Sequence, residues 1–79
     1  MIYVYILQSI NFPDKHYVGI TEDLKHRLKE HNSANHKYSQ RFEPWTIKNY
    51  FAFKDTEKAY LFEKYLKTSS GRSFCKKHF

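Results

Sequence analysis

An arginine and a histidine lie on the side of a predicted helix that should face the protein core. Residues 22–31 carry Leu24 and Leu28 at the spacing of a buried helix side. At about 100° per residue, Arg27 falls about 60° and His31 about 20° from the direction of Leu24. Burying a guanidinium is costly, so the structural interpretation is an Arg27 stem that follows the edge of the core and keeps its charge in water. His31 alone is explained as a core or helix-end histidine.

A second predicted helix, over residues 57–70, carries a negative charge on its inward side. Glu63 follows Ala59 by four residues and precedes Leu66 by three, so it projects from the same side as these apolar residues. A carboxylate in this position must be paired, hydrogen-bonded or bound to a metal ion. Two interpretations stay open: an ion pair with Arg27 that joins the two helices, or a ligand for a divalent metal ion that faces a cleft.

Several tyrosines belong to the strands next to these helices. Tyr3 and Tyr5 share one face of a predicted strand, and Tyr17 lies in the next strand, two residues before Gly19. One strand tyrosine usually belongs to the core or its rim, but several phenols near an arginine and an inward glutamate are less ordinary. A phenol with its ordinary pKa of about 10 is a poor base. A neighbouring metal ion or cation lowers this pKa, and a tyrosinate can then take a proton from an attacking water.

No competing signature of another chemistry is present. The two glycines, Gly19 and Gly71, stand alone and form no phosphate-binding loop. The five histidines do not combine with Cys75 at the spacing of a zinc site, and no serine lies in a nucleophile elbow. A helix with clustered Arg and Asn that would read DNA bases is also not evident.

The composition indicates one small basic domain over residues 1–79, with seven Tyr, seven Phe, one Trp and a formal net charge of +6. Basic and aromatic character favours a polyanionic partner, nucleic acid first, although a basic surface without a specific partner fits the charge equally well.

Cys75 is the only cysteine, which excludes an intrachain disulfide. Since neither an apolar run of about 18 residues nor a signal-peptide pattern is present, we expect no membrane association. The expected location is the cytoplasm, with the nucleoid if the source is bacterial.

The chain alternates strand and helix patterns in the order β-β-α-β-α, with a short C-terminal helix. Turn residues separate the first two strands, which therefore form a hairpin. A hairpin and a third strand after a helix predict an α+β fold, with a small three-stranded antiparallel sheet flanked by helices. The predicted strands are residues 2–8, 16–20 and 45–53, and the predicted helices are residues 22–31, 57–70 and a short segment after Gly71.

Cap residues predict the limits of the two longer helices. Thr21 offers an oxygen to the start of the first helix, and the two acidic residues after it fall in the first turn. Asp55 or Thr56 caps the second helix, and Gly71 is placed to end it.

Four short segments, taken together, resemble the GIY-YIG nuclease superfamily. The segments "YVY" at residues 3–5 and "YVG" at residues 17–19 are similar to its two half-motifs. The segment "DLKHRLKEHN" is similar to the family's first helix with its catalytic arginine, and "FEKYLKTSSGRSF" to its glutamate-bearing helix. The resemblance covers essentially the whole chain and is greatest with small, stand-alone members of a single domain.

The resemblance implies a hydrolase that cleaves phosphodiester bonds in DNA with one divalent metal ion, Mg²⁺ or Mn²⁺. Tyr5 matches the tyrosine of the first half-motif, and Tyr17 that of the second, which the family uses as the general base. Arg27 matches the arginine that steadies the phosphate, and His31 falls where some members carry a histidine near the scissile phosphate. Glu63 matches the single protein ligand of the metal ion. Such chemistry needs a base for the water and positive charge on the phosphoryl oxygens.

The sequence departs from the family at two positions. Tyr3 stands where many members have glycine, and Ile20 stands where the repair-nuclease branch often carries lysine. The chain therefore has one less cation facing the phosphate, for which Lys15, His16 or Lys37 would have to compensate.

The small size of the chain bears on its partners. A lone catalytic module of 79 residues should bind DNA weakly, through Lys and Arg on phosphates and with strong salt dependence. We therefore expect structure-selective or weakly sequence-specific cleavage of branched, flapped or nicked duplexes. A second copy of the chain or a partner protein is expected to assist, and DNA repair is among the roles that this implies.

Two other functions stay open. The first is a non-catalytic nucleic-acid-binding module that retains the fold, which Ile20 and the small size motivate. The second is a basic structural protein in which the tyrosines, Arg27 and Glu63 form a network in the core, within one chain or across a dimer.

Overall fold

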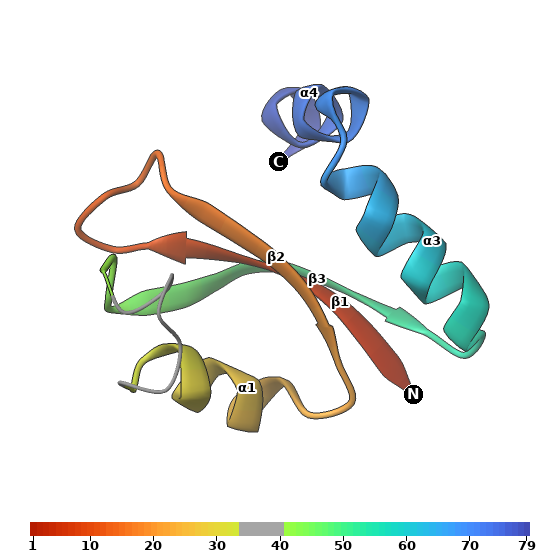
Figure 1. The fold of residues 1–79 in the computed structure, drawn as a ribbon, viewed down its shortest axis with the longest axis horizontal. Helices are drawn as coiled ribbons and strands as arrows, with labels where there is room; N and C mark the ends of the chain where they lie inside the picture. The colour runs from red at the N-terminus through yellow and green to blue at the C-terminus, as the bar shows by residue number, and fades with distance from the viewer. Residues whose placement is uncertain (34–40) are drawn as a thin grey trace.

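The computed structural model describes residues 1–33 and 41–79, and it confirms the predicted α+β fold. The strands and helices of this part of the chain follow one another in the predicted order (Figure 1). In chain order they are β1 (Ile2–Ser9), β2 (His16–Thr21), α1 (Leu24–His31), β3 (Trp45–Phe53), α3 (Thr56–Leu66) and α4 (Ser69–His78). None of these helices is long and apolar enough to cross a membrane.

The first strand, β1, is the centre of an antiparallel sheet with the order β2-β1-β3. Tyr5 in the middle of β1 is the partner of Gly19 in β2 and of Tyr50 in β3. Because successive side chains of a strand point to opposite faces, β1 contributes to two cores at once. Helix α1 covers one face of the sheet, and α3 and α4 lie on the other (Figure 1).

Each face of the sheet has its own apolar cluster. On the side of α3 and α4, aliphatic residues of β1 pack against α3, with aromatic residues of β3 and α4 around them. On the side of α1, Tyr5 and Leu7 pack with Trp45, and the two leucines of α1 cover them. The buried residues of the first cluster are Ile2, Val4, Ile6, Ala59 and Leu66.

The first helix begins later than the sequence predicts. Helix α1 starts at Leu24 and Asp23 is its N-cap, because the Asp23 carboxylate accepts a hydrogen bond of 3.0 Å from the His26 N–H. Thr21 is the last residue of β2, and its hydroxyl accepts a hydrogen bond of 3.1 Å from the Asp23 N–H. The prediction that Thr21 caps the helix was therefore wrong, and the acidic residues precede the first turn.

The second predicted helix consists of two helices. Helix α3 follows its predicted cap, Asp55, but ends at Leu66, and α4 begins after a new cap, Thr68, whose hydroxyl accepts a hydrogen bond of 3.1 Å from the Gly71 N–H. Gly71 was predicted to end the helix, but it is buried in the first turn of α4. A Cβ atom at this position would collide with the Tyr65 carbonyl oxygen. The glycine is therefore needed for close packing between the two helices.

Candidate active site

Two tyrosines and a histidine meet beneath α1. Tyr5 is almost fully buried, and its hydroxyl shares a hydrogen bond of 3.1 Å with His31 Nε2. The rings of Tyr17 and His31 have centroids 4.5 Å apart, and those of Tyr5 and Tyr17 are stacked at 6.5 Å. His31 is the last residue of α1 and is 0% exposed. Its side chain therefore contacts the two phenols from within the core.

Gly19 makes room for the ring of Tyr5. The two residues are partners across β1 and β2, and a Cβ atom at Gly19 would overlap the Tyr5 hydroxyl and its ring. The glycine of the second half-motif thus allows the phenol to lie flat against the neighbouring strand. A larger residue would displace Tyr5 from His31.

Asn32 fixes the end of α1 against β3. Its side-chain N–H donates to the Trp45 carbonyl oxygen at 3.1 Å, and its side-chain oxygen accepts from the Trp45 N–H at 2.6 Å. These two hydrogen bonds hold the preceding residue, His31, over the sheet. Asn32 was not among the predicted site residues, although an asparagine directly after a predicted helix is a frequent partner of backbone groups.

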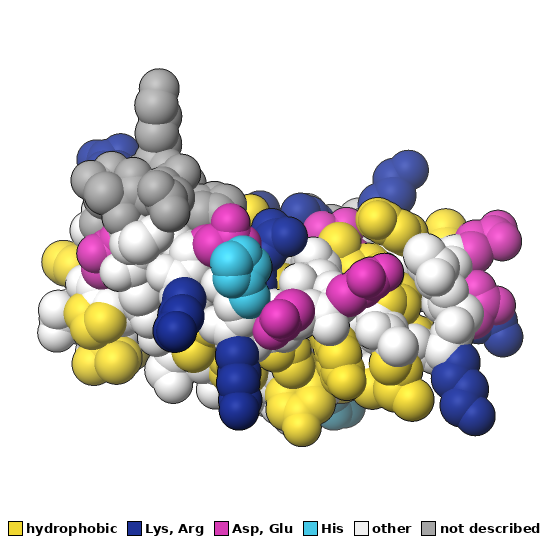
Figure 2. Space-filling model, turned by 90° about the horizontal axis from the view of Figure 1, so that it is seen from below, with side chains coloured by type: hydrophobic (Ala, Val, Ile, Leu, Met, Phe, Trp, Pro, Cys, Tyr) yellow, Lys and Arg dark blue, Asp and Glu magenta, His cyan; other side chains and the backbone are white. Residues whose placement is uncertain are grey.

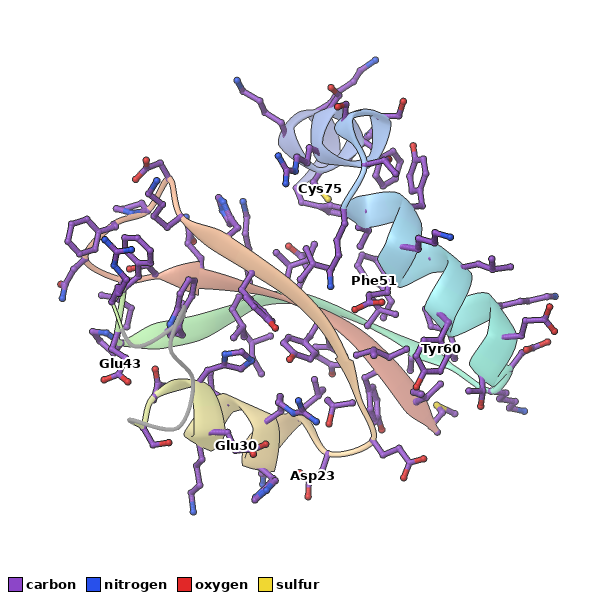
Figure 3. All side chains as sticks on the ribbon, viewed as in Figure 1. Asp23, Glu30, Glu43, Phe51, Tyr60 and Cys75 are labelled. Carbon is purple, nitrogen blue, oxygen red and sulfur yellow. The ribbon has the colours of Figure 1, made fainter. Side chains whose placement is uncertain are left out.

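The side chain of Arg27 extends from the edge of the core to the surface. Its side chain is 37% exposed, as the structural interpretation of its position predicts. Together with Tyr60 of α3 it lines a shallow hollow of about 370 Å³ at the ends of β1 and β2. Tyr60 extends from α3 towards the strands (Figure 3), and the sequence analysis did not identify it. Its signal is an exposed aromatic residue one turn before Glu63.

Both signs of charge are present on the outer surface of α1. Glu30 lies 3.3 Å from Arg27 Nε and 3.7 Å from His26 Nε2. Seen from the side of α1, acidic, basic and histidine side chains are interspersed in the middle of the molecule (Figure 2). An anion at Arg27 therefore has to compete with the carboxylate of Glu30.

Glu63 lies on the inward side of α3, as predicted, with 18% of its side chain exposed. Its Oε2 atom is 3.0 Å from the Nζ atom of Lys67, one turn later in the same helix. The alternative of a Glu63–Arg27 ion pair was wrong, because Arg27 pairs with Glu30 and Glu63 with Lys67. The charges of Glu63 and Arg27 nevertheless both act on the phenol of Tyr5. Charges from helices on opposite faces of the sheet thus influence the pKa of one buried side chain.

Burial raises the pKa of the Tyr5 phenol well above its ordinary value of 10.0. Tyr17 raises this pKa further, and Arg27 lowers it only in part. A nearby cation was expected to lower the pKa of a site tyrosine, but at Tyr5 the effect of burial is larger. Tyr5 therefore keeps its proton at neutral pH, and its hydroxyl can donate a hydrogen bond but not act as a base.

Within residues 1–33 and 41–79, no three His, Cys, Asp or Glu side chains gather as a metal site, so Glu63 could offer a divalent metal ion only a single carboxylate. The carboxylate is partly withdrawn from water, and its observed partner is an ammonium group, whose place a metal cation can take. Mg²⁺ is usually held by one or two carboxylates together with water and substrate phosphate. A single glutamate is compatible with this mode of binding.

The cations that were expected to replace a lysine at position 20 lie elsewhere. Ile20 borders the hollow that contains Arg27, whereas Lys15 and His16 line another cleft, at the opposite end of β2. Lys37 falls outside the described residues. Neither Lys15 nor His16 therefore compensates for the departure at Ile20.

A family model described as the GIY-YIG catalytic domain matches residues 1–77 of this chain. The matched range contains Tyr5, Tyr17, Arg27 and Glu63. No curated protein and no solved structure matches the chain.

Proposed function

Since the chain belongs to the GIY-YIG family, whose domains are usually DNA-binding nucleases, we propose that it is a divalent-metal-dependent endonuclease. We further propose that branched, flapped or nicked duplexes are its substrates, because so small a module offers little surface for reading a long sequence. The observation that carries the proposal is the stacking of Tyr17 from β2 on Tyr5, whose phenol pKa is also influenced by the charges of Arg27 from α1 and Glu63 from α3.

Arg27 is the proposed clamp on the scissile phosphate. Its side chain is partly exposed and lines the hollow at the strand ends, whereas its Nε atom is buried. A substrate phosphate there exchanges the weak pair with Glu30 for charge-assisted hydrogen bonds to an anion. The same guanidinium then stabilises the negative charge that develops on the phosphoryl oxygens.

Tyr17 is the proposed general base that takes the proton of the attacking water. It is only partly buried, whereas its neighbour Tyr5 is buried and keeps its proton. Of the two stacked phenols, Tyr17 is thus the one that a water molecule can approach. We assign Tyr5 and His31 the role of positioning residues, since their hydrogen bond and their ring contacts fix the orientation of Tyr17.

Glu63 is the proposed ligand of Mg²⁺ or Mn²⁺. When bound, such an ion supplies positive charge to the phosphoryl oxygens and to the leaving oxygen. Glu63 holds its carboxylate towards the site from α3, and Lys67 neutralises it at 3.0 Å. Lys67 must therefore release the carboxylate before it can serve as a ligand.

The test is cleavage of labelled branched, flapped and nicked DNA by the purified chain with Mg²⁺ or Mn²⁺. We expect products only with a divalent metal ion. Both Glu63→Gln and Arg27→Ala should lower the rate by about 100-fold or more, since each removes a group that stabilises the transition state. Lys64→Gln, an exposed change on α3, is the matched control and should cleave like the parent. Cleavage that persists at the parent's rate in both site variants would refute the proposal.

A second candidate is a nucleic-acid-binding module without turnover. The ion pair between Glu63 and Lys67 favours it, because this pair satisfies the Glu63 carboxylate without any metal ion. This candidate predicts salt-dependent binding of DNA and no products on any substrate. Metal-dependent cleavage that requires Glu63 excludes it.

A further inference from the structure

A second cleft, of about 790 Å³, lies on the side of the sheet opposite to α1. The start of β2 and the middle of β3 form one wall, and the end of α3 with α4 forms the other. Its apolar lining consists of Ile6, Val18, Leu66 and Phe79. Cys75 lies on the side of α4 that is turned towards the sheet (Figure 3) and also lines the cleft.

The rim of this cleft is strongly basic. Five Lys and Arg residues line it, against one acidic residue among the described part of the chain, Asp14. Two of the cations have other contacts, since the Lys15 Nζ atom lies 5.6 Å from the centroid of the Phe42 ring and Lys67 pairs with Glu63. Within residues 1–33 and 41–79, no ion pair joins the remaining three, Lys48, Arg72 and Lys76, to an acidic side chain.

The charge of Lys48 lowers the pKa of a residue on each wall of the cleft. Burial lowers the pKa of His16 on β2, and Lys48 lowers it further. Burial raises the pKa of the Cys75 thiol on α4, and Lys48 counteracts this in part. A cation from β3 therefore acts across the whole width of the cleft, as a group that neutralises a bound anion should.

One side of α3 leads from the candidate active site to this cleft. Tyr60, Glu63 and Lys67 follow one another at intervals of three and four residues and thus share a side of the helix. Tyr60 borders the hollow that contains Arg27, and Lys67 borders the basic cleft. The helix rises about 6 Å from Glu63 to Lys67, which is close to two nucleotides of a strand at about 3.4 Å each.

We propose that the cleft between β2, β3 and α4 is a second phosphate-binding site, which holds the nucleic-acid backbone a few nucleotides from the bond that is cut. This inference rests on the proposed function, because it takes the occupant to be the strand bound at Arg27 and Glu63. Lys48, Arg72 and Lys76 contact successive phosphates, and Lys67 lies where the strand passes from one site to the other. Since none of these contacts reaches a base, the cleft adds affinity without sequence preference.

The first test measures binding of the full chain to a fluorescent nicked duplex in EDTA, where no metal-dependent cleavage occurs. Arg72→Gln combined with Lys76→Gln removes two cations of the cleft, and Lys58→Gln combined with Lys64→Gln removes two exposed cations of α3 outside it. We expect the cleft variant to bind about 10-fold more weakly at low salt and its salt slope to fall by about 1.4–1.8, as for two lost phosphate contacts. The control variant should keep the parent's slope. Equal slopes in both variants would overturn the proposal.

The second test needs no substitution, because Cys75 is the only cysteine in the chain. Saturating nicked duplex should slow the reaction of Cys75 with a maleimide at least about 5-fold, since the bound strand fills the cleft. Inorganic phosphate and an acidic peptide of matched charge serve as competitors for comparison. An unchanged reaction rate with duplex, or equal protection by the acidic peptide, would overturn the assignment to a nucleic acid.

Each of the two proposals can be refuted while the other stands. If no DNA is ever cleaved but duplex protects Cys75 and needs Arg72 and Lys76, the binding site stands and the nuclease proposal falls. If cleavage depends on Glu63 but the cleft variant binds like its control and Cys75 is not protected, the nuclease stands and the second site falls.

Discussion

Tyr5 and Tyr17 lie on neighbouring strands, and their surroundings suit them to different tasks. Tyr5 is enclosed by β2, α1 and its hydrogen bond to His31, and burial keeps its phenol protonated. Tyr17 stacks on Tyr5 but is partly exposed, beside the ring of His31. The buried phenol is suited to orientation, and the more exposed phenol to proton transfer.

This division predicts unequal effects of removing either hydroxyl. Tyr17→Phe should lower metal-dependent cleavage by about 100-fold or more, the usual effect of losing a general base. Tyr5→Phe should lower cleavage less, because it removes a hydrogen bond to His31 and leaves the base in place. Rates on one nicked duplex, with the circular dichroism of each variant, measure this. A larger loss in Tyr5→Phe than in an equally folded Tyr17→Phe would contradict the assignment.

The raised pKa of Tyr5 predicts a change of stability with pH. In the unfolded chain Tyr5 ionises near 10.0, whereas the folded chain holds the proton to higher pH. Folding is therefore favoured by proton binding, and this stabilisation is lost as the pH rises above about 10. Tyr5→Phe has no phenol to ionise, so its stability does not fall in this way. The difference in the free energy of unfolding between the parent and Tyr5→Phe should therefore become smaller between about pH 9 and pH 11. Urea unfolding at each pH measures it, and a constant difference would refute the argument.

For single residues, the sequence predicted the side of the helix on which a residue lies better than it predicted the residue's ion-pair partner. Helical spacing alone placed His31 and Glu63 on inward sides and Arg27 at the edge, and the structure agrees. The partners Glu30 and Lys67 were not predicted, because periodicity gives the side of a helix on which a residue lies but not which neighbour it contacts. An intrahelical partner is always within reach, whereas a pair between helices depends on how they pack.

At the scale of elements, the strands were easier to predict than the helix ends. The strand predicted over residues 45–53 matches β3 in full, because β-branched and aromatic residues between turn residues mark its limits on both sides. Helix ends depend on a single hydrogen bond, and neighbouring residues compete for it. Asp23 displaced Thr21 as a cap, and Thr68 started a new helix inside the segment predicted as one helix over residues 57–70.

The junction of α3 and α4 predicts an unusual response at Gly71. Glycine to alanine within a helix normally stabilises by about 0.5–1 kcal/mol. At Gly71 the new Cβ atom would collide with the Tyr65 carbonyl oxygen and with the backbone of Leu66, so we expect Gly71→Ala to destabilise by about 1–3 kcal/mol. The exposed Ser70→Ala in the same helix is the control and should change stability by less than about 0.5 kcal/mol. Urea unfolding compares the variants, and a more stable Gly71→Ala would show that the helices can separate.

At the scale of the whole molecule, a hollow of mixed charge and a basic cleft lie at different places on the fold, since Glu22 and Asp23 line the hollow beside Arg27. The hollow with Arg27 lies at the ends of β1 and β2, and the larger basic cleft lies between the sheet and α4. The net charge of +6 predicted a polyanionic partner, but not where its phosphates bind. Lys48 is far in the sequence from Arg72 and Lys76, and only the packing of α4 against the sheet brings it to the same cleft as these two residues.

The central claim, that Glu63 is the metal ligand of a nuclease, is tested most directly by anomalous diffraction. Crystals of Tyr17→Phe with an uncleaved nicked duplex and Mn²⁺ would locate both the ion and the strand. We expect an anomalous peak at the Glu63 carboxylate, a phosphate against Arg27, and a Lys67 Nζ atom moved beyond its present 3.0 Å from Glu63 Oε2. An intact pair between Glu63 and Lys67, with Mn²⁺ bound to other carboxylates or to none, would contradict it.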